Sequence, residues 1–353
     1  MRNSDNSDNL QQQVRDSIAE VVPLRICGGN TKLFYGNKSE GKVLDVNSHT
    51  GIVSYEPTEL VITARAGTPV KEINAVLAEQ NQMLAFEPRS FGEKATIGGT
   101  IACNFSGPRR PYAGAARDFV LGSKIINGKA EILGFGGQVM KNVAGYDVSR
   151  LMAGALGTLG IILDVSLKVL PKSDAELTLV FHSAVEDSLH NIHQWQRLPL
   201  PISACCFDDK TLTLRLSGTH ETLTQAKHRL GGDELADADT FWGDINEQQT
   251  DFFKQVGNLW RVSLASNAPV LDLAGEWFYD WGGAQRWLRT ELPANEVRAK
   301  VEQVGGHATL IRGDVNTEKF HPLPAGLMKV HRKLKQAFDP YGIFNRGRLY
   351  RDI

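Results

Sequence analysis

The sequence predicts an α+β protein of two domains, each built from a sheet and helices. Residues 24–64 contain short apolar or alternating segments separated by Gly, Asn, Ser and Pro turns, a pattern typical of strands. Residues 87–137 are rich in glycine and contain few long apolar runs. After residue 171 the glycine density falls and a new series of strand and helix signals begins. A chain of 353 residues is long enough to bury more than one hydrophobic core.

The first domain is expected to begin with a helix that is followed by four strands. Leu10, Val14 and Ile18 mark one face of a short helix that ends before Pro23. The strands are predicted at residues 24–27, 43–46, 51–55 and 60–64.

A second helix and a long glycine-rich stretch come next. Thr68 and Pro69 predict a helix start, with the hydroxyl as the N-cap and the proline at the first helical position. The stretch 87–137 is mostly loop, but apolar strands at 119–121 and 124–126 interrupt it. A loop of this length in a compact domain is usually functional or disordered, and the apolar strands argue against disorder. We therefore expect a ligand to bind there.

The stretch "AGALGTLGIILDVSLKVLP", residues 153–171, combines recurring glycines with the apolar residues of a buried element. Each glycine weakens a helix or strand interior by about 0.5–1 kcal/mol. We therefore expect Gly154, Gly157 and Gly160 to mark a close approach of the backbone. Residues 161–170 are predicted to form a strand, and Pro171 ends the domain.

The second domain, residues 173–324, is predicted as an antiparallel sheet with helices on one face. The expected strands are 177–181, 202–207, 212–216, 260–264, 277–281 and 307–311, and the expected helices are 185–195, 221–230 and 295–304. The second half repeats part of the element order of the first. Six tryptophans of this domain are assigned to the core or to an interface: Trp195, Trp242, Trp260, Trp277, Trp281 and Trp287.

The C-terminal segment, residues 325–353, is expected to return to the first domain. Its helix, 325–338, carries apolar residues on one face, namely Leu327, Val330, Leu334 and Phe338. The helix is predicted to end at Asp339 and Pro340.

Net charge, cysteine spacing and the length of apolar runs exclude several classes of protein. The formal net charge is -1 and the pI is about 6.8, so no long-range field attracts nucleic acid, and no nucleic-acid partner is expected. The four cysteines form no CxxC pair, and we expect them to be reduced. Residues 1–9 do not resemble a signal peptide, and no apolar run approaches the ~20 residues of a membrane span. A cytoplasmic protein is expected, which partner subunits can hold at the inner membrane.

Two glycine-rich segments are candidates for ligand binding. In "RICGGNTK", residues 25–32, a Gly-Gly-Asn-Thr turn follows a strand, and its successive N–H groups can form a nest for a phosphate. In "TIGGTIACNFSGPRRPYAG", residues 96–114, glycines allow close approach of a ligand, and Thr, Ser and Asn side chains supply neutral donors. Taken singly, each segment also fits an ordinary turn or surface loop. Neither a Rossmann nor a P-loop pattern occurs in the required context.

Two other sets of residues are candidates for a metal site and for a substrate-binding site. His190 and His193 have the spacing of zinc ligands on a helix, but no third ligand accompanies them, so no metal site is predicted. Four arginines can hold a substrate carboxylate, although each also fits a structural ion pair: Arg261, Arg286, Arg289 and Arg312.

In their order and spacing, the segments resemble the FAD-binding fold of the vanillyl-alcohol oxidase and p-cresol methylhydroxylase (PCMH) type. The resemblance rests on "RICGGNTK", "EPTELVITARAGTPVKEINAVLAE", the stretch from "FEPRSFGEKATIGGT" to "INGKAE", "FGGQVMKNVAGYDVSRLMAGALGTLGIILDVSLKVLP" and "FDPYGIFNRGRLY". It covers residues 1–172 and the tail, and it implies two α+β subdomains beside a second, cap domain. More narrowly, "SGPRRPYAGAARD" and "GQVMKNVAGYDVSRL" are similar to the E subunits of bacterial glycolate oxidases.

The resemblance implies noncovalently bound FAD and a set of FAD-binding residues. The first pyrophosphate loop corresponds to Cys27, Gly28, Gly29, Asn30 and Thr31, and the second phosphate and flavin loop to Thr96, Gly98, Gly99 and Ser106. The segment near the adenosine half corresponds to Gly157 and Ile161, and an asparagine near the flavin to Asn345. On this basis Gly157 leaves room for the cofactor, so that Gly157→Val is expected to fold normally but to retain less FAD. The resemblance assigns no catalytic residue to this chain.

The resemblance also implies a function. It predicts a flavin-dependent oxidoreductase of glyoxylate metabolism that works beside a larger FAD-containing catalytic subunit and an iron–sulfur subunit, and that takes part in oxidising a small 2-hydroxyacid, glycolate. Two alternatives stay open: a self-sufficient FAD-dependent D-2-hydroxyacid (D-lactate) dehydrogenase, and a scaffold subunit without a redox role. Stand-alone dehydrogenases of this fold carry a His-rich acidic cluster, whereas "GGHATLIRGD", residues 305–314, holds a single histidine. This departure weakens the first alternative.

Overall fold

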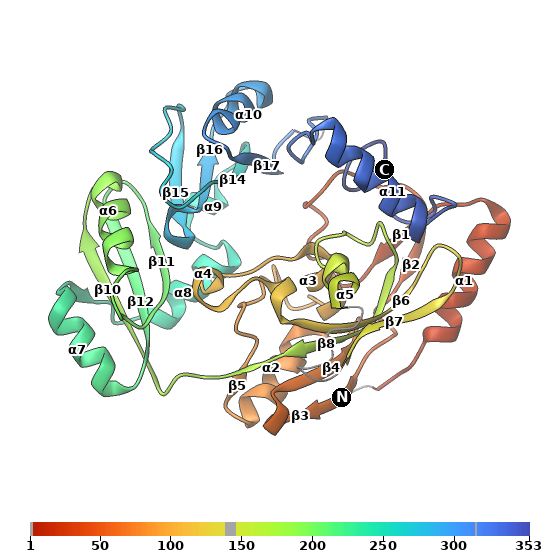
Figure 1. The fold of residues 1–353 in the computed structure, drawn as a ribbon, viewed down its shortest axis with the longest axis horizontal. Coiled ribbons are helices and arrows are strands. Elements are labelled where there is room, and N and C mark those ends of the chain that lie inside the picture. Colours follow the sequence, from red (N-terminus) through yellow and green to blue (C-terminus); the bar gives the residue numbers. More distant parts are fainter. Residues whose placement is uncertain (1–2, 138–145, 315) are drawn as a thin grey trace. The chain divides into compact units, whose positions relative to one another are not determined.

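The computed structural model of the chain describes residues 3–137, 146–314 and 316–353 (Figure 1). Most of the motif "GQVMKNVAGYDVSRL", residues 137–151, therefore lies outside the described residues. The chain divides into two compact units: unit 1 comprises Met1–Phe105, Ala115–Pro171 and Pro322–Ile353, and unit 2 comprises Ser106–Gly114 and Lys172–His321. The segment Ser106–Gly114, expected in the first domain, thus groups with the second unit. No helix in the described ranges is both long and apolar enough to cross a membrane.

Unit 1 is built around an antiparallel sheet of five strands. In sheet order, these are β3 (Ile52–Glu56), β4 (Val61–Arg65), β8 (Ile161–Lys168), β6 (Val120–Ile126) and β7 (Ile132–Gly136). The two short strands predicted at 119–121 and 124–126 are a single strand, β6. Helix α3 (Ile97–Cys103) packs against β4 and β8, and α5 (Tyr146–Met152) against β6 and β7. The apolar residues of β8 supply much of the core between these layers.

A second, smaller part of unit 1 contains the N-terminal helix α1 (Ser7–Glu20) and two parallel strands. Strands β1 (Leu24–Cys27) and β2 (Lys42–Asp45) pair along their length. The C-terminal tail runs along the other edge of β1, where Leu24 bridges to Phe344. Two short strands, β5 (Gln82–Met83) and β9 (Leu170–Pro171), also pair. The first loop therefore leaves β1 between β2 and the chain's own C-terminal tail.

The predicted cap of the second helix is wrong. Helix α2 spans Val70–Glu79, and its N-cap is Pro69, which lacks a side chain that could accept a hydrogen bond. Thr68 Oγ1 instead accepts from the Gly51 N–H at 2.9 Å and lies 3.1 Å from the Gly51 carbonyl oxygen. The threonine fixes the turn before β3, since its buried hydroxyl satisfies both backbone groups of a single residue.

Unit 2 contains an eight-stranded antiparallel sheet made of two similar halves. The first half is β10 (Ala175–His182), α6 (Val185–Trp195), β11 (Ile202–Phe207), β12 (Thr211–Gly218), α7 (His220–Leu230) and β13 (Asp233–Glu234). The second half is β14 (Leu259–Ser263), β15 (Glu276–Asp280), β16 (Gln285–Arg289), α10 (Ala294–Gln303) and β17 (His307–Arg312). The sheet order β13-β10-β12-β11-β15-β16-β14-β17 places the four strands of each half in mirrored order. Each half has the strand order of a split βαβ unit.

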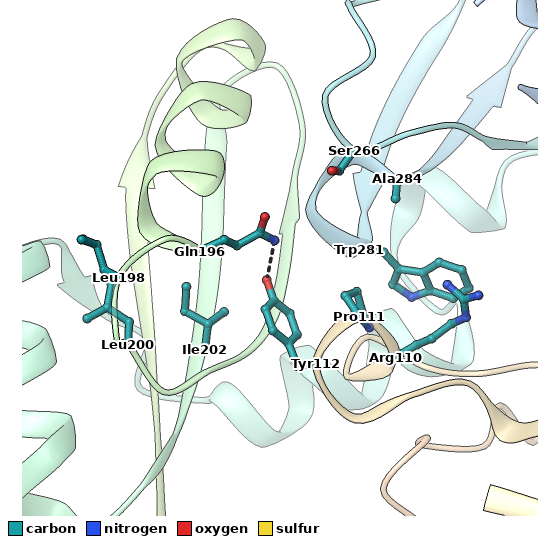
Figure 2. Close-up of a pocket in the computed structure, with 10 residues that line it drawn as sticks. All are labelled: Arg110, Pro111, Tyr112, Gln196, Leu198, Leu200, Ile202, Ser266, Trp281 and Ala284. Carbon is teal, nitrogen blue, oxygen red and sulfur yellow. Dashed lines mark hydrogen bonds between the residues drawn. The ribbon is translucent and has the colours of Figure 1, made fainter. Parts of the chain in front are cut away.

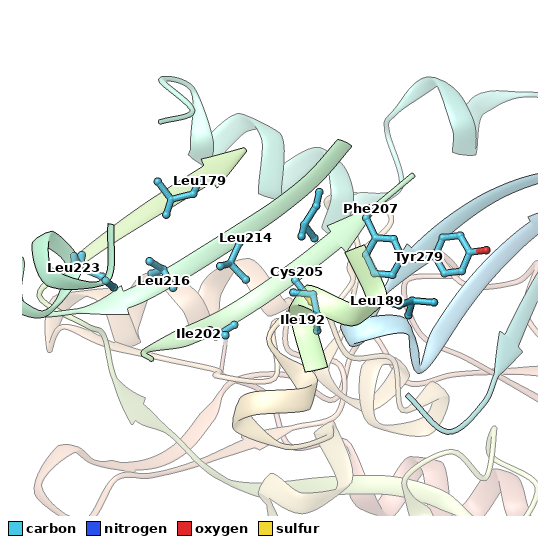
Figure 3. Close-up of a cluster of buried hydrophobic side chains, with 12 residues drawn as sticks. Leu179, Leu189, Ile192, Ile202, Cys205, Phe207, Leu214, Leu216, Leu223 and Tyr279 are labelled. Atoms are coloured by element: carbon cyan, nitrogen blue, oxygen red, sulfur yellow. The ribbon is translucent and has the colours of Figure 1, made fainter. Parts of the chain in front are cut away.

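Helices cover both faces of this sheet, so the prediction of a single covered face is wrong. Figure 3 shows the apolar core on one face, where Leu189 and Ile192 of α6 belong to the same buried cluster as Leu214 of β12. Helices α6, α7 and α10 pack on this face. Thr178 points to the opposite face, where its Oγ1 accepts from Trp242 Nε1 at 2.9 Å. Trp242 belongs to α8 (Ala238–Glu247), and α9 (Asp251–Lys254) follows it.

The segment 106–114 joins unit 2 through a polar network on this second face. It contains the short helix α4 (Arg110–Ala113). Arg109 forms an ion pair with Glu176 and donates to Ser217 Oγ at 3.1 Å. Burial raises the pKa of Glu176, but Arg215 and Arg109 outweigh this and hold it below its usual value. The network fixes the segment at β10 and β12.

Helix α11 (Ala325–Phe338) groups with unit 1, and the first two residues of its predicted apolar face are exposed while Leu334 and Phe338 are half-buried. Leu327 and Val330 are 47% and 49% exposed, whereas Lys335 is only 9% exposed. Lys335 Nζ donates to the Thr158 carbonyl at 2.8 Å, to the Phe344 carbonyl at 2.8 Å and to Asp339 Oδ2 at 2.7 Å. Burial lowers the pKa of Lys335, and the Asp339 carboxylate partly offsets this.

We predict that Lys335→Met destabilises the protein by about 3–5 kcal/mol, because it leaves the Asp339 carboxylate buried without its cation. The measurement is urea unfolding of the full chain at neutral pH. Lys333→Met is the matched control, since it removes an exposed lysine of the same helix and should change the free energy of unfolding by less than about 0.5 kcal/mol. Equal midpoints for the two variants would refute the proposed role of Lys335.

Candidate functional site

The first loop presents backbone donors that have no acceptor within the described residues. Strand β1 ends at the buried Cys27, and Asn30 adopts the left-handed conformation with a φ of 57°. Among the residues that the structure describes, the N–H groups of Gly28, Gly29, Asn30 and Thr31 donate to no acceptor. Successive N–H groups in a turn that contains a left-handed residue can bind an anion. The loop has the donor set that a pyrophosphate requires.

The two glycines of this loop are required by close packing against the second loop. A Cβ on Gly28 would lie 2.6 Å from Thr96 Oγ1, and a Cβ on Gly29 would lie 1.5 Å from the Lys94 carbonyl oxygen. Any side chain at position 29 would therefore push the two loops apart. The structure thus brings together two segments that are about 65 positions apart in the sequence.

The N–H groups of the second loop are already bonded within the chain. Thr96 is the N-cap of α3, and its Oγ1 accepts from Gly99 N–H. The N–H groups of Ile97 and Gly98 donate to the carbonyls of Thr68 and Ala66. Residues 97–103, expected as part of a loop, thus form helix α3 and contribute its shape rather than free backbone donors. Gly98 allows that shape, because a Cβ there would meet Ala66 Cβ at 2.5 Å.

One side chain of α3 is an unsatisfied polar group. Thr100 is completely buried, and its Oγ1 has no hydrogen-bond partner in the described part of the chain. An unpaired buried hydroxyl costs about 1–3 kcal/mol, and such groups in native proteins usually meet a ligand or water. Thr100 thus fits a site that binds a polar ligand.

Aromatic and cationic side chains surround the first loop, and the sequence patterns did not single them out. Tyr35 packs on Phe105 with ring centroids 4.5 Å apart, and Phe91 lies 5.6 Å from Phe105. Lys32 Nζ donates to the Ser90 carbonyl at 3.2 Å, which places a positive charge at the end of the loop. The loop thus lies beside an apolar wall and one buried cation.

The position that a Cβ of residue 157 would take lies against other parts of the chain. A Cβ on Gly157 would lie 2.7 Å from Asn345 Nδ2, and the φ of Gly157 is 71°. Asn345 Nδ2 donates to the Leu156 carbonyl at 2.6 Å, while Asn345 Oδ1 accepts from Ile26 N–H at 2.8 Å. The Asn345 amide therefore links the 153–160 turn to β1. A valine at position 157 would displace this amide, so we now expect Gly157→Val to be destabilised, while contact of Gly157 with FAD stays a prediction.

The two remaining candidate residues are Ile161 and Ser106. Ile161 is fully buried at the start of β8, where it pairs with Ile126 of β6. Ser106 is buried in the segment that belongs to unit 2. Their contacts with a cofactor stay a prediction.

Three of the four candidate arginines bind the protein's own backbone. Arg286 donates to the carbonyls of Gly283, Pro269 and Ala268. Arg289 and Arg312 donate to backbone carbonyls of residues 253–256. Within the described ranges no group of three or more His, Cys, Asp or Glu side chains is arranged to hold a metal ion.

Comparison with known proteins adds the family context. A family described as an FAD binding domain matches residues 4–136. The glycolate oxidase subunit GlcE of Escherichia coli is 48% identical over 353 residues, which cover the whole of both chains. The glycolate oxidase subunit GlcD of Bacillus subtilis is 31% identical over 178 residues, 50% of this chain and 37% of that protein.

The chain is also similar to a dehydrogenase in sequence and to a synthase in structure. D-Lactate dehydrogenase of Anaerostipes hadrus is 28% identical over 259 residues, 71% of this chain and 53% of that protein. A solved structure of alkyldihydroxyacetonephosphate synthase matches with a TM-score of 0.65 and 14% identity, over 96% of this chain and 74% of that one. The fold is therefore the α+β fold of the PCMH type.

We predict that Gly157→Ala destabilises the protein even without a bound ligand. The left-handed backbone alone costs an alanine about 1–2 kcal/mol, and the new Cβ also displaces the Asn345 amide. Urea unfolding of the ligand-free chain measures the loss. Gly134→Ala is the control, because a Cβ there meets nothing within 4 Å.

The double variant Gly157→Ala/Asn345→Ala separates the two effects. If the Cβ acts through Asn345, the loss in the double variant is smaller than the sum of the two single losses. Unfolding midpoints of Gly157→Ala and Gly134→Ala that coincide would contradict the assignment.

Proposed function

Because the chain belongs to the family of the glycolate oxidase subunit GlcE, we propose that it is the FAD-binding subunit of a multi-subunit glycolate oxidase, which oxidises glycolate to glyoxylate. The chain is an FAD-binding oxidoreductase subunit. The single observation that carries the proposed role is the 48% identity over the full length of both chains.

The first loop is proposed to hold the pyrophosphate of FAD. The four N–H groups of Gly28–Thr31 have no acceptor in the described part of the chain, and the buried Lys32 ammonium adds a positive charge nearby. The neutral donors bind the phosphate oxygens, and the aromatic wall of Tyr35 and Phe105 excludes water from one side. FAD supplies hydride acceptance from a substrate carbon when it is bound.

The other candidate residues are proposed to shape the site. Thr96, Gly98 and Gly99 place the start of helix α3 against the first loop, and Thr100 offers a hydroxyl without a partner in the described part of the chain. Asn345 is proposed to act as a positioning residue, because both ends of its amide already bind the backbone. Cys27, Ser106 and Ile161 stay in the proposed FAD-binding set.

The partners are proposed to be a larger FAD-containing catalytic subunit and an iron–sulfur subunit. The similarity of half of this chain to GlcD of B. subtilis supports a common origin with another glycolate oxidase subunit. Any attachment to the inner membrane is proposed to occur through these partners. The similarity to D-lactate dehydrogenase supports one competing function, a self-sufficient D-2-hydroxyacid dehydrogenase.

We predict that Gly29→Ala weakens FAD retention by about tenfold or more. Its Cβ would lie 1.5 Å from the Lys94 carbonyl oxygen, so the loop must move and its N–H groups lose their common direction. The measurement is the ratio of flavin absorbance to protein after gel filtration, together with FAD titration of the apoprotein. Gly326→Ala, where a Cβ meets nothing within 4 Å, should retain FAD normally. Normal FAD affinity in Gly29→Ala would contradict the loop assignment.

We predict that the purified chain absorbs as a flavoprotein and that anaerobic glycolate bleaches it little until the partner subunits are added. The reason is that the substrate carbon is proposed to transfer its hydride in the larger subunit. Rapid bleaching of the isolated chain by glycolate or D-lactate would favour the self-sufficient dehydrogenase. A colourless chain that does not bind added FAD would refute the proposed function.

A further inference from the structure

Arg348 of the C-terminal tail binds the turn that follows the first glycine loop. Its Nη1 donates to the Asn37 carbonyl at 3.0 Å, and its Nη2 donates to the carbonyls of Leu33 at 3.2 Å and Lys32 at 3.4 Å. These carbonyls belong to one turn, residues 32–37, which begins directly after the loop. Because a guanidinium presents its N–H groups in a rigid fork, this side chain holds both ends of the turn at once.

The backbone of the tail completes this clamp. Asn37 N–H donates to the Arg348 carbonyl at 2.9 Å, and Asn37 Nδ2 donates to the Leu349 carbonyl at 3.1 Å. Gly36 allows the close approach, since its φ is 85° and a Cβ there would lie 2.9 Å from the Arg348 carbonyl oxygen. Main-chain and side-chain bonds therefore join the turn to the tail, although Asn37 and Arg348 are 311 positions apart.

The turn that Arg348 holds carries side chains of the proposed FAD site. Lys32 Nζ donates to the Ser90 carbonyl at 3.2 Å, and the Tyr35 ring packs on Phe105 with centroids 4.5 Å apart. Tyr35 N–H donates at 3.1 Å to the Lys32 carbonyl, which Arg348 also binds. The positions of the buried cation and of the aromatic wall therefore depend on a carbonyl group that belongs to the Arg348 clamp.

Arg348 also lies near the ends of the two elements that adjoin the site. Strand β1 ends at Cys27 and helix α3 ends at Cys103. Burial raises the pKa of both thiols, and the positive charge of Arg348 is one of the effects that oppose this rise at each of them. The guanidinium is itself partly buried, and this burial lowers its pKa. A single side chain of the tail is thus close to β1, to α3 and to the turn at 32–37.

We propose that Arg348 is a positioning residue for FAD: it fixes the turn at 32–37 and, through this turn, the direction of the N–H groups of the first loop. This inference rests on the proposed FAD-binding function. The guanidinium donates to main-chain carbonyls of the turn, so it acts on the cofactor through the loop rather than by contact. N–H groups that must converge on one anion bind it less well when the adjoining turn can move.

The test is FAD titration of the full-length apoprotein, followed by flavin fluorescence. Arg348→Met keeps the apolar stem and removes every donor, so it is expected to bind FAD about tenfold more weakly. Arg348→Lys keeps the charge and places its donors on one nitrogen, so it should lose less affinity than Arg348→Met. An FAD affinity of Arg348→Met equal to that of the unchanged protein would overturn the proposal.

ADP is the second probe, because it contains the pyrophosphate and lacks the flavin. Isothermal titration calorimetry should show that Arg348→Met weakens ADP by about the same factor as FAD. Gly36→Ala disturbs the clamp from the side of the turn, because its Cβ would meet the Arg348 carbonyl, and it should weaken both probes as well. Unchanged ADP binding in Arg348→Met would separate Arg348 from the pyrophosphate loop and overturn the proposal.

Two control variants separate positioning from a general loss of stability. Arg346→Met removes an exposed arginine of the same tail, whose Nε donates to the Gly342 carbonyl, and should bind FAD normally. Ile202 is buried in the core of unit 2 and lines the cavity drawn in Figure 2. Ile202→Ala should lower the free energy of unfolding but keep the FAD affinity. An equal loss of FAD affinity in Ile202→Ala and Arg348→Met would assign the effect to instability and overturn the proposal.

The unchanged protein separates this inference from the proposed function. If the unchanged chain bound no FAD, the proposed function would fail and this inference would fail with it. If the unchanged chain bound FAD and Arg348→Met bound it equally well, the proposed function would stand and this inference alone would fail.

Discussion

The first glycine loop is fixed by side chains that come from the far end of the chain. The Asn345 amide accepts from Ile26 N–H, immediately before the loop, and donates to the Leu156 carbonyl. Lys335 binds the carbonyl of Thr158 in the same turn. Strand β1, the 153–160 turn and the tail are therefore one hydrogen-bonded assembly, although Ile26 and Asn345 are 319 positions apart. Since unpaired buried amides are costly, these three segments can only be ordered together.

Regular elements could be predicted from the sequence because their apolar residues repeat with a clear period. The bounds of α6, α11, β1 and β11 agree with the expected ranges. Lys335 could not be predicted in this way, because a lysine on an amphipathic helix is normally assigned to solvent. Its burial depends on carbonyls from two distant turns, which no local pattern contains. The only local signal is Asp339 four residues later.

The burial of the polar face of the eight-stranded sheet also could not be predicted from the sequence. Thr178 and Arg215 alternate with apolar residues along β10 and β12, a pattern that indicates a solvent-exposed face. Both are nevertheless buried, because Trp242 of α8 donates to Thr178 and stacks 5.0 Å from the Arg215 guanidinium. Helix α8 was not predicted, so nothing in the strand pattern could indicate a cover. Within the candidate site, the first loop could be predicted from the sequence, because a glycine-rich turn directly after a strand is a local pattern.

The first loop is built to bind with backbone groups rather than with side chains. The loop after β1 offers backbone N–H groups, which are neutral and whose direction is fixed by the chain's fold, so it needs precise packing at Gly28 and Gly29. A side chain can be held by a single neighbour, whereas a backbone loop must be held along its length. This difference explains why the loop depends on contacts from distant segments of the chain.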